Sequence, residues 1–90
     1  MDNRFKKGVI IQLEENSTDK YIIVENMEIE NKVYLLLTEF EGEIENNTVK
    51  EFNIDYSKMF VVCYNLNNNE INYDSNEEIV RKLIRKSLNA

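Results

Sequence analysis

The sequence contains no histidine, and this absence removes much of the side-chain chemistry that enzymes use. Histidine is the commonest general base and metal ligand, and Ser-His and Cys-His pairs both require it. The one cysteine, Cys63, excludes an internal disulfide and a cysteine-rich zinc site. It lies in the apolar run "MFVVCYNL" without a basic neighbour, which favours a buried core thiol over a reactive one.

Proline is absent, and the glycines are limited to Gly8 and Gly42, so the sequence holds no glycine-rich phosphate loop. The segment 65–77, "NLNNNEINYDSNE", superficially resembles a calcium loop, but it lacks the glycine of the sharp turn and has apolar residues at ligand positions. The residue types present do not exclude a hydrolase that uses paired carboxylates, although such an enzyme needs a cleft that a small sheet rarely offers. We expect a protein without catalytic residues, metal or cofactor.

Long hydrophobic runs are also absent. No apolar run approaches the roughly 18–20 residues that cross a bilayer. The N-terminal stretch "MDNRFKKGVIIQLEE" has too few apolar residues for a secretory signal and no small-residue cleavage site after them. We expect a cytoplasmic protein that makes no membrane contact.

The apolar residues that are present group into short runs of β-type residues over the first three quarters of the chain. Valine, isoleucine, tyrosine and phenylalanine alternate with stretches of Asn, Asp, Ser and Glu, a pattern typical of strands and turns. The predicted strands are Val9–Glu14, Tyr21–Met27, Lys32–Phe40, Thr48–Ile54, Lys58–Leu66 and, more weakly, Glu70–Tyr73. The stretch "MEIEN" is ambiguous, because Met27 and Ile29 continue the alternation of the second strand.

The C-terminal segment changes to a helical period. Its aliphatic residues form one stripe of Ile79, Val80, Leu83, Ile84 and Leu88. Ser75 is a suitable N-cap, and Glu78 three residues later completes a capping box. Glu77 with Arg81 and Glu78 with Lys82 are spaced for ion pairs along the helix.

These elements predict an α+β fold in a single domain, residues 1–90, with a strand-rich body at 8–73 and a helix at 75–88. Five or six short strands suit a small antiparallel curled sheet or an SH3-like half-barrel. The C-terminal amphipathic helix would close it by burying its aliphatic stripe.

The net charge of −6 is unevenly spread. Residues 1–74 carry 7 basic and 15 acidic groups, whereas residues 75–90 carry 4 basic and 2 acidic groups. An acidic body repels phosphate, so direct nucleic-acid binding is disfavoured and a basic protein surface is attracted. The basic residues of the helix (Arg81, Lys82, Arg85 and Lys86) form either a solvated face or a contact for an acidic patch, including one on a second copy.

The most unusual stretch is "TEFEGEIE", in which Glu39, Glu41, Glu43 and Glu45 occupy alternate positions. On a strand these four would form an outward row about 6.6 Å apart, while Phe40 and Ile44 face the core. Such a row protects a strand edge from aggregation. Alternatively, Gly42 starts a turn and the alternation is accidental. The functional interpretation is an acidic partner-binding row that docks on a basic groove, extended by Glu25, Glu28, Glu30 and Glu51 if their strands are neighbours.

Five tyrosines and four phenylalanines could stack on single-stranded nucleic acid. Such platforms normally accompany a basic groove, whereas the predicted strands here are acidic. Packing in and around the core is the favoured role, with one or two tyrosines as interface anchors.

The stretch "GVIIQLEENSTDKYIIVENMEIENKVYLLL", together with the terminal "DSNEEIVRKLIRKSL", resembles a loose group of short strand-rich proteins from low-GC bacteria, phages and mobile elements. Asn, Ile, Lys and Glu fill 45 of the 90 positions, which agrees with an A/T-rich genome. Here "NK" replaces the glycine turn of that group, and residues 41–58 have no counterpart. The resemblance implies a small partner-binding protein, by analogy with compact acidic phage inhibitors of host nucleases such as anti-CRISPR proteins.

Our leading hypothesis from the sequence is a non-enzymatic acidic binding protein, from a phage or mobile element, that inhibits a nucleic-acid-handling defence protein such as a CRISPR nuclease. The alternatives are a self-associating structural or regulatory module of a bacterial host, which would form a homodimer, and an enzyme acting through carboxylates.

Overall fold

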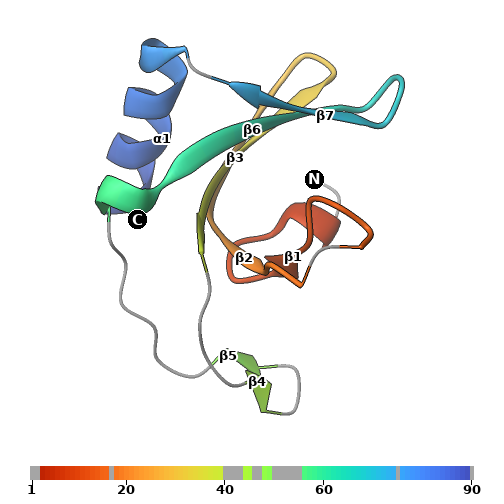
Figure 1. The fold of residues 1–90 in the computed structure, drawn as a ribbon. Helices are drawn as coiled ribbons and strands as arrows, with labels where there is room; N and C mark the ends of the chain where they lie inside the picture. Colours follow the sequence, from red (N-terminus) through yellow and green to blue (C-terminus); the bar gives the residue numbers. More distant parts are fainter. Residues whose placement is uncertain are drawn as a thin grey trace.

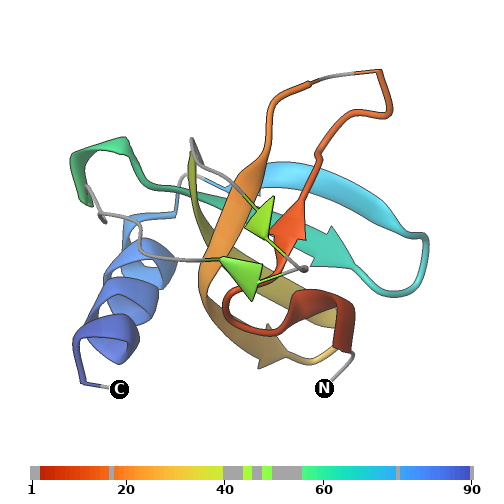
Figure 2. The same ribbon diagram turned by 90° about the horizontal axis from the view of Figure 1, so that it is seen from below.

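The computed structural model describes residues 3–16, 18–39, 44–45, 48–49, 56–74 and 76–89. It forms a curled, five-stranded antiparallel half-barrel with one C-terminal helix, as the sequence predicts (Figures 1 and 2). The sheet runs in the order β1 (Ile10–Ile11), β2 (Tyr21–Ile29), β3 (Lys32–Glu39), β6 (Phe60–Asn65) and β7 (Glu70–Asp74). The remaining elements are η1 (Asn3–Phe5), the hairpin β4 (Ile44–Glu45) and β5 (Thr48–Val49), η2 (Tyr56–Lys58) and α1 (Glu77–Leu88).

Strands lie at the predicted places, but the first is limited to Ile10–Ile11. Of the strand expected over 48–54, Thr48–Val49 form β5, and residues 50–54 lie outside the described residues. The ambiguous "MEIEN" stretch continues β2 to Ile29.

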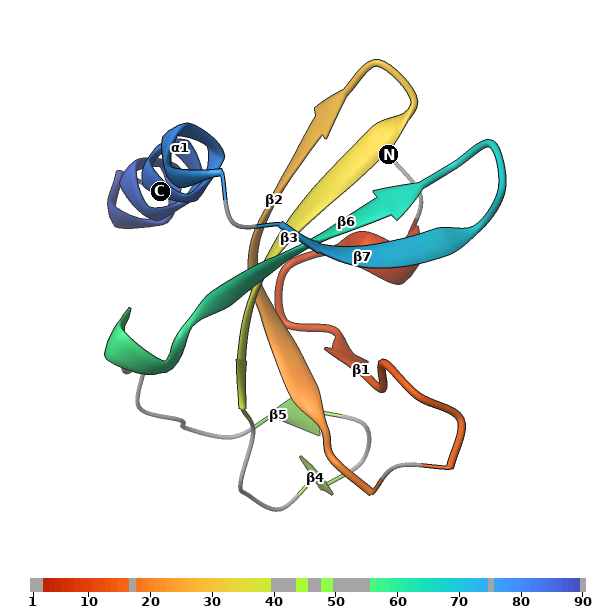
Figure 3. The same ribbon diagram turned by 45° about the horizontal axis from the view of Figure 1, so that its top comes forward.

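Strand β3 is central, and both of its faces are covered. Its residues Leu35, Leu36 and Leu37 are at most 1% exposed. One face, inside the curl, packs with the N-terminal segment, and the other packs against α1 (Figure 3). The inner cluster consists of Phe5, Ile23, Val33, Leu35, Leu37, Val62 and Tyr64, and the helix-side cluster centres on Leu36, Val61 and Leu83. A small chain therefore shares one central strand between two apolar clusters.

The helix buries most of its predicted stripe. Ile79, Val80, Leu83 and Ile84 all pack in the helix-side cluster. The prediction is wrong for Leu88, which is 65% exposed. At about 100° per residue, Leu88 lies about 140° around the helix from Leu83, beyond the buried face.

The helix begins one residue later than predicted. Asn76 is the N-cap, and its Oδ1 accepts the Glu78 N–H at 3.0 Å. Because Asn76 is the N-cap, the predicted capping box of Ser75 and Glu78 is wrong, and an asparagine, which caps helices about as well as serine, takes its place. Ser75 itself lies outside the described residues. The ion pairs of Glu77 with Arg81 and Glu78 with Lys82 are present at 3.6 and 3.3 Å, on exposed side chains.

The β2–β3 connection is tight and uses glutamate where glycine is usual. Ile29 pairs with Lys32, which leaves Glu30 and Asn31 as the connecting residues. Glu30 has φ +56°, a left-handed conformation that costs a residue with a Cβ about 1–2 kcal/mol. The strain lies in one exposed turn.

We therefore expect Glu30→Gly to raise the free energy of unfolding by about 0.5–1 kcal/mol, because glycine adopts this φ without a steric penalty. Urea unfolding of the purified chain measures the change. Glu28→Gly in β2 is the matched control and should lower stability. Equal losses for both variants would show that the turn is not strained.

Candidate functional site

The predicted glutamate row is described at one residue only. Glu39 ends β3, is exposed, and pairs in register with Tyr21. Glu41 and Glu43 lie outside the described residues, as does Phe40, and the side chain of Glu45 in β4 is not described. Alternation along β3 places Glu39 on the same face as Leu37, so it marks the rim of the inner face of the half-barrel.

The proposed extension of that row is wrong for three of its four residues. Glu25 is fully buried and cannot join a surface row. Glu28 and Glu30 are exposed but lie at the opposite end of the β2–β3 pair from Glu39, because Glu28 pairs with Val33 and Glu30 is in the turn. Glu51 lies outside the described residues.

Three carboxylates act on the hydroxyl of Tyr21. Glu14 and Asp19 from the β1–β2 connection and Glu39 from β3 lie close enough to act on its hydroxyl. Burial is the largest cause that raises the pKa of Tyr21 above its ordinary value of 10.0. The pKa is raised further by the charges of Asp19, Tyr73, Glu39 and Glu14. We call Glu14, Asp19 and Glu39 the acidic end of the half-barrel.

An aromatic row crosses three strands beside the acidic end. The rings of Tyr21 and Phe60 meet edge to face at 5.2 Å, and those of Phe60 and Tyr73 lie 5.8 Å apart at 37°. Tyr73 on β7 is 73% exposed. Because tyrosine combines an apolar ring with a polar hydroxyl and is enriched at interfaces, the exposed end of the aromatic row is a candidate binding surface.

An apolar pocket of about 450 Å³ lies next to this row. Val9 and Ile11 line it from the N-terminal side, Leu35 and Tyr64 from the sheet, and Ile71 from β7. Arg4 lies at its wall, with its guanidinium carbon 5.1 Å from the Phe5 ring centre and 5.6 Å from that of Tyr64.

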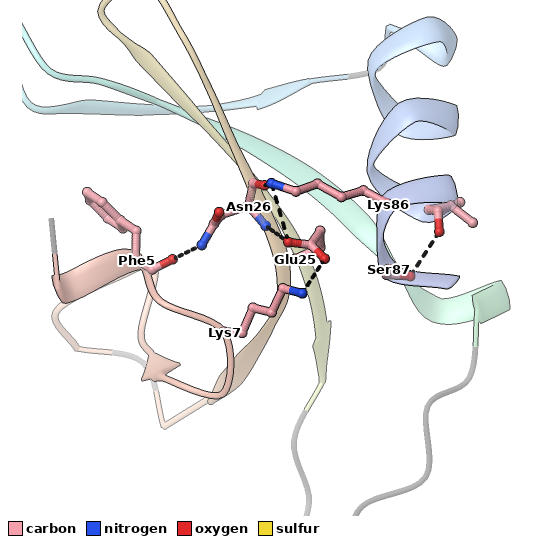
Figure 4. Close-up of polar contacts among 7 residues, drawn as sticks. Phe5, Lys7, Glu25, Asn26, Lys86 and Ser87 are labelled. Carbon is pink, nitrogen blue, oxygen red and sulfur yellow. Dashed lines mark hydrogen bonds and ion pairs between the residues drawn. The ribbon is translucent and has the colours of Figure 1, made fainter. Parts of the chain in front are cut away.

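A buried carboxylate joins three parts of the chain (Figure 4). A β-bulge at Val24 lets both Val24 and Glu25 face α1, since Glu25 pairs with Leu36 of the helix-side cluster. Lys7 Nζ lies 2.8 Å from Glu25 Oε2 and Lys86 Nζ lies 3.7 Å from Oε1, which also accepts the Asn26 N–H. Oε2 accepts no hydrogen bond of regular geometry among the described residues, so its contact with Lys7 is an ion pair.

The neighbouring Asn26 completes this connection. Its Nδ2 donates to the Phe5 carbonyl at 2.7 Å, and its own carbonyl accepts from Lys86 at 2.7 Å. The N-terminal segment, β2 and α1 are thus held at one point. Lys86 therefore does not belong to a freely solvated basic face of the helix, which corrects one interpretation of the sequence.

Cys63 is half-buried on β6, less enclosed than the core position predicted, and it pairs in register with Tyr34. Burial raises the pKa of the Cys63 thiol above its ordinary value of 9.0. Burial is also the largest cause that raises the pKa of Tyr34 above 10.0, and the charge of Cys63 is the second. These shifts hold both groups protonated at neutral pH and give the thiol low reactivity.

The same shifts predict a loss of stability in alkali. Tyr21, Tyr34 and Cys63 bind their protons more tightly when folded, so the unfolded chain holds fewer protons between the two pKa values. The contribution of these three groups to the free energy of unfolding should be constant below about pH 9 and should fall as pH rises further. Urea midpoints across this range measure it, with Tyr34→Phe giving a shallower fall. A midpoint that rises above pH 9 would contradict the assignment.

Within the described residues, no three acidic or cysteine side chains are grouped as metal ligands would be, and no helix is both long and apolar enough to cross a membrane. The fold and site together define a small α+β half-barrel with an acidic and aromatic rim. No family model, curated protein or solved structure matches the chain. The resemblance to strand-rich phage and bacterial proteins therefore stays a prediction.

The tyrosines and the acidic body are evident in the sequence, but the sequence does not reveal that they meet at this site. In the sequence, Glu14 and Asp19 are two of 17 acidic residues and Tyr73 is one of five tyrosines, and nothing distinguishes them from the others. Their meeting depends on the register of Tyr21 with Ile11 and Glu39, and on the order of β6 and β7. An acidic residue at each end of the β1–β2 connection was the one available signal.

Proposed function

We propose that this chain is a non-catalytic binding protein that docks on a basic surface of another protein. One observation carries the proposal: carboxylates from two separate segments, Glu14, Asp19 and Glu39, act on the hydroxyl of Tyr21, which begins an aromatic row whose outer ring, Tyr73, is exposed. Carboxylates beside open aromatic faces attract arginine and lysine side chains. The net charge of −6 favours such a partner over nucleic acid.

The resemblance of the sequence extends the proposal to a particular kind of partner. We propose a nucleic-acid-handling defence protein, such as a CRISPR nuclease, met in the cytoplasm by an inhibitor of phage or mobile-element origin. A basic groove that normally holds nucleic acid has the charge that the acidic end would recognise. This extension rests on the resemblance, and the binding surface rests on the geometry.

Fluorescence anisotropy with labelled octa-arginine as the probe tests the binding surface. The triple variant Glu14→Gln, Asp19→Asn, Glu39→Gln should lose about tenfold or more in affinity. The matched control is Glu28→Gln, Glu77→Gln, Glu78→Gln, which removes the same charge from exposed sites elsewhere. A third variant, with Glu41, Glu43 and Glu45 changed to glutamine, tests the row predicted from the sequence.

If the test variant and the matched control lost equal affinity for octa-arginine, net charge alone would explain the binding, and the proposal would be contradicted. Binding should also weaken steeply as salt rises. The alternative of a self-associating module is favoured by the exposed Ile71 and Tyr73 on the edge strand β7. A dimer mass in light scattering that Tyr73→Ser abolishes would establish that alternative instead.

A further inference from the structure

Within the part of the chain that the structure describes, the half-barrel is open along one side. Among the described strands, β1 pairs with β2 alone and β7 with β6 alone, so β1 and β7 are the free edges of the sheet (Figure 3). The apolar pocket lies between these edges, with Ile11 on one side and Ile71 on the other. A free edge presents backbone N–H and C=O groups that an added strand can pair with.

The apolar pocket and the aromatic row form one continuous surface. Ile71 and Tyr73 are two residues apart on β7, so their side chains share a face about 6.6 Å apart. On the opposite edge, Ile11 of the pocket is the register partner of Tyr21 in the row. An extended chain lying along β7 would therefore meet an apolar position and an aromatic position at a spacing of two residues.

Charge gives these two positions different preferences. The acidic end, Glu14, Asp19 and Glu39, acts on the Tyr21 hydroxyl of the aromatic row, as Tyr73 does, whereas Arg4 lies at the wall of the apolar pocket. A cation over an aromatic ring beside carboxylates is favourable, and the same cation beside Arg4 is not. The cationic side chain of a ligand therefore belongs at Tyr73, and an uncharged one belongs at Ile71.

We propose that the open side of the half-barrel binds an extended segment of the partner protein in which an arginine or lysine stands two residues from a valine, isoleucine or leucine. The segment pairs with the free edge of β7, its cationic side chain lies against Tyr73, and its apolar side chain enters the pocket beside Ile71. The inference rests on the proposed function and adds to it the backbone form and residue spacing of the partner.

Three synthetic peptides test this spacing by NMR titration of the ¹⁵N-labelled chain. The first, acetyl-SRSVSVS-amide, places arginine and valine on one face of a strand. The second, acetyl-SRVSVSS-amide, has the same composition with arginine on the opposite face from the valines. The third, acetyl-SESVSVS-amide, replaces arginine by glutamate. The first should bind about tenfold more tightly than either of the others and shift the amides of β7 and β1.

Single variants locate the two positions. Ile71→Ser and Tyr73→Ser should each weaken the first peptide about tenfold. Ile29→Ser is the matched control, because Ile29 is 39% exposed and Ile71 is 40% exposed, and it should leave binding unchanged. Because Ile29, Ile71 and Tyr73 are at least 39% exposed, each variant should keep its fold, which the unperturbed part of the spectrum verifies.

The outcomes separate the two proposals. If the first two peptides bind equally well and depend on the acidic end but not on Ile71 or Tyr73, the spacing is overturned and the proposed function survives. If no peptide binds while octa-arginine still does, the strand-like mode is likewise overturned. If octa-arginine binds the triple variant of the acidic end as tightly as the unsubstituted chain, the proposed function itself fails.

Discussion

Replacing Lys7 and Lys86 together by methionine is expected to lower the free energy of unfolding by about 3 kcal/mol or more. Both ammonium groups face the carboxylate of Glu25, whose side chain is 0% exposed. Removing them leaves a buried negative charge with the Asn26 N–H as its remaining partner in the contacts above. A small domain is stable by only about 5–15 kcal/mol, so the loss should be obvious in urea unfolding.

Two further variants make this result specific. Adding Glu25→Met to the double variant should restore most of the lost stability, because an apolar side chain replaces a buried ionic cluster at little cost. The pair Lys6→Met and Lys20→Met removes the same charge from exposed positions and should have little effect. A rescue that fails, or a control as unstable as the test variant, would refute the role assigned to Glu25.

Leu83→Ala is expected to cost about 3 kcal/mol. Leu83 is 0% exposed and packs with Leu36 and Val61, so alanine would leave a cavity between α1 and the sheet. Leu88→Ala, on the same helix at 65% exposure, should change stability by less than about 0.5 kcal/mol.

Thermal and urea unfolding of the two leucine variants measure this difference. Both substitutions keep a strong helix former, so helix propensity cancels in the comparison. Similar small losses in both variants would mean that the helix contributes little to the core, contrary to its position in the helix-side cluster.

The fold was predictable because its signals are local. Runs of β-branched and aromatic residues marked β2, β3 and β6, and the helical stripe marked α1. The two errors lie at the ends of the helix: Leu88 is exposed, and Asn76 in place of Ser75 is the N-cap. Sequence patterns place helix ends only to within one or two residues, because neighbouring residues can cap the helix or end its apolar stripe equally well.

The two functional features depended on tertiary register. The bulge at Val24 turns Glu25 toward the helix, although simple alternation from Tyr21 and Ile23 predicts a shared face with those residues. The acidic end likewise needs Glu14, Asp19 and Glu39 to meet at Tyr21 across two strand pairings. Neither arrangement leaves a periodic pattern in the sequence, whereas the glutamate row was conspicuous.

Intermolecular NOE measurements on the chain with the first peptide are the sharpest test of our proposal that a basic, extended segment binds along β7 on the open side of the half-barrel. We expect contacts from the Tyr73 ring to the arginine side-chain protons and from the Ile71 methyls to a valine. Contacts to α1 in their place, or to residues scattered over the surface, would contradict it.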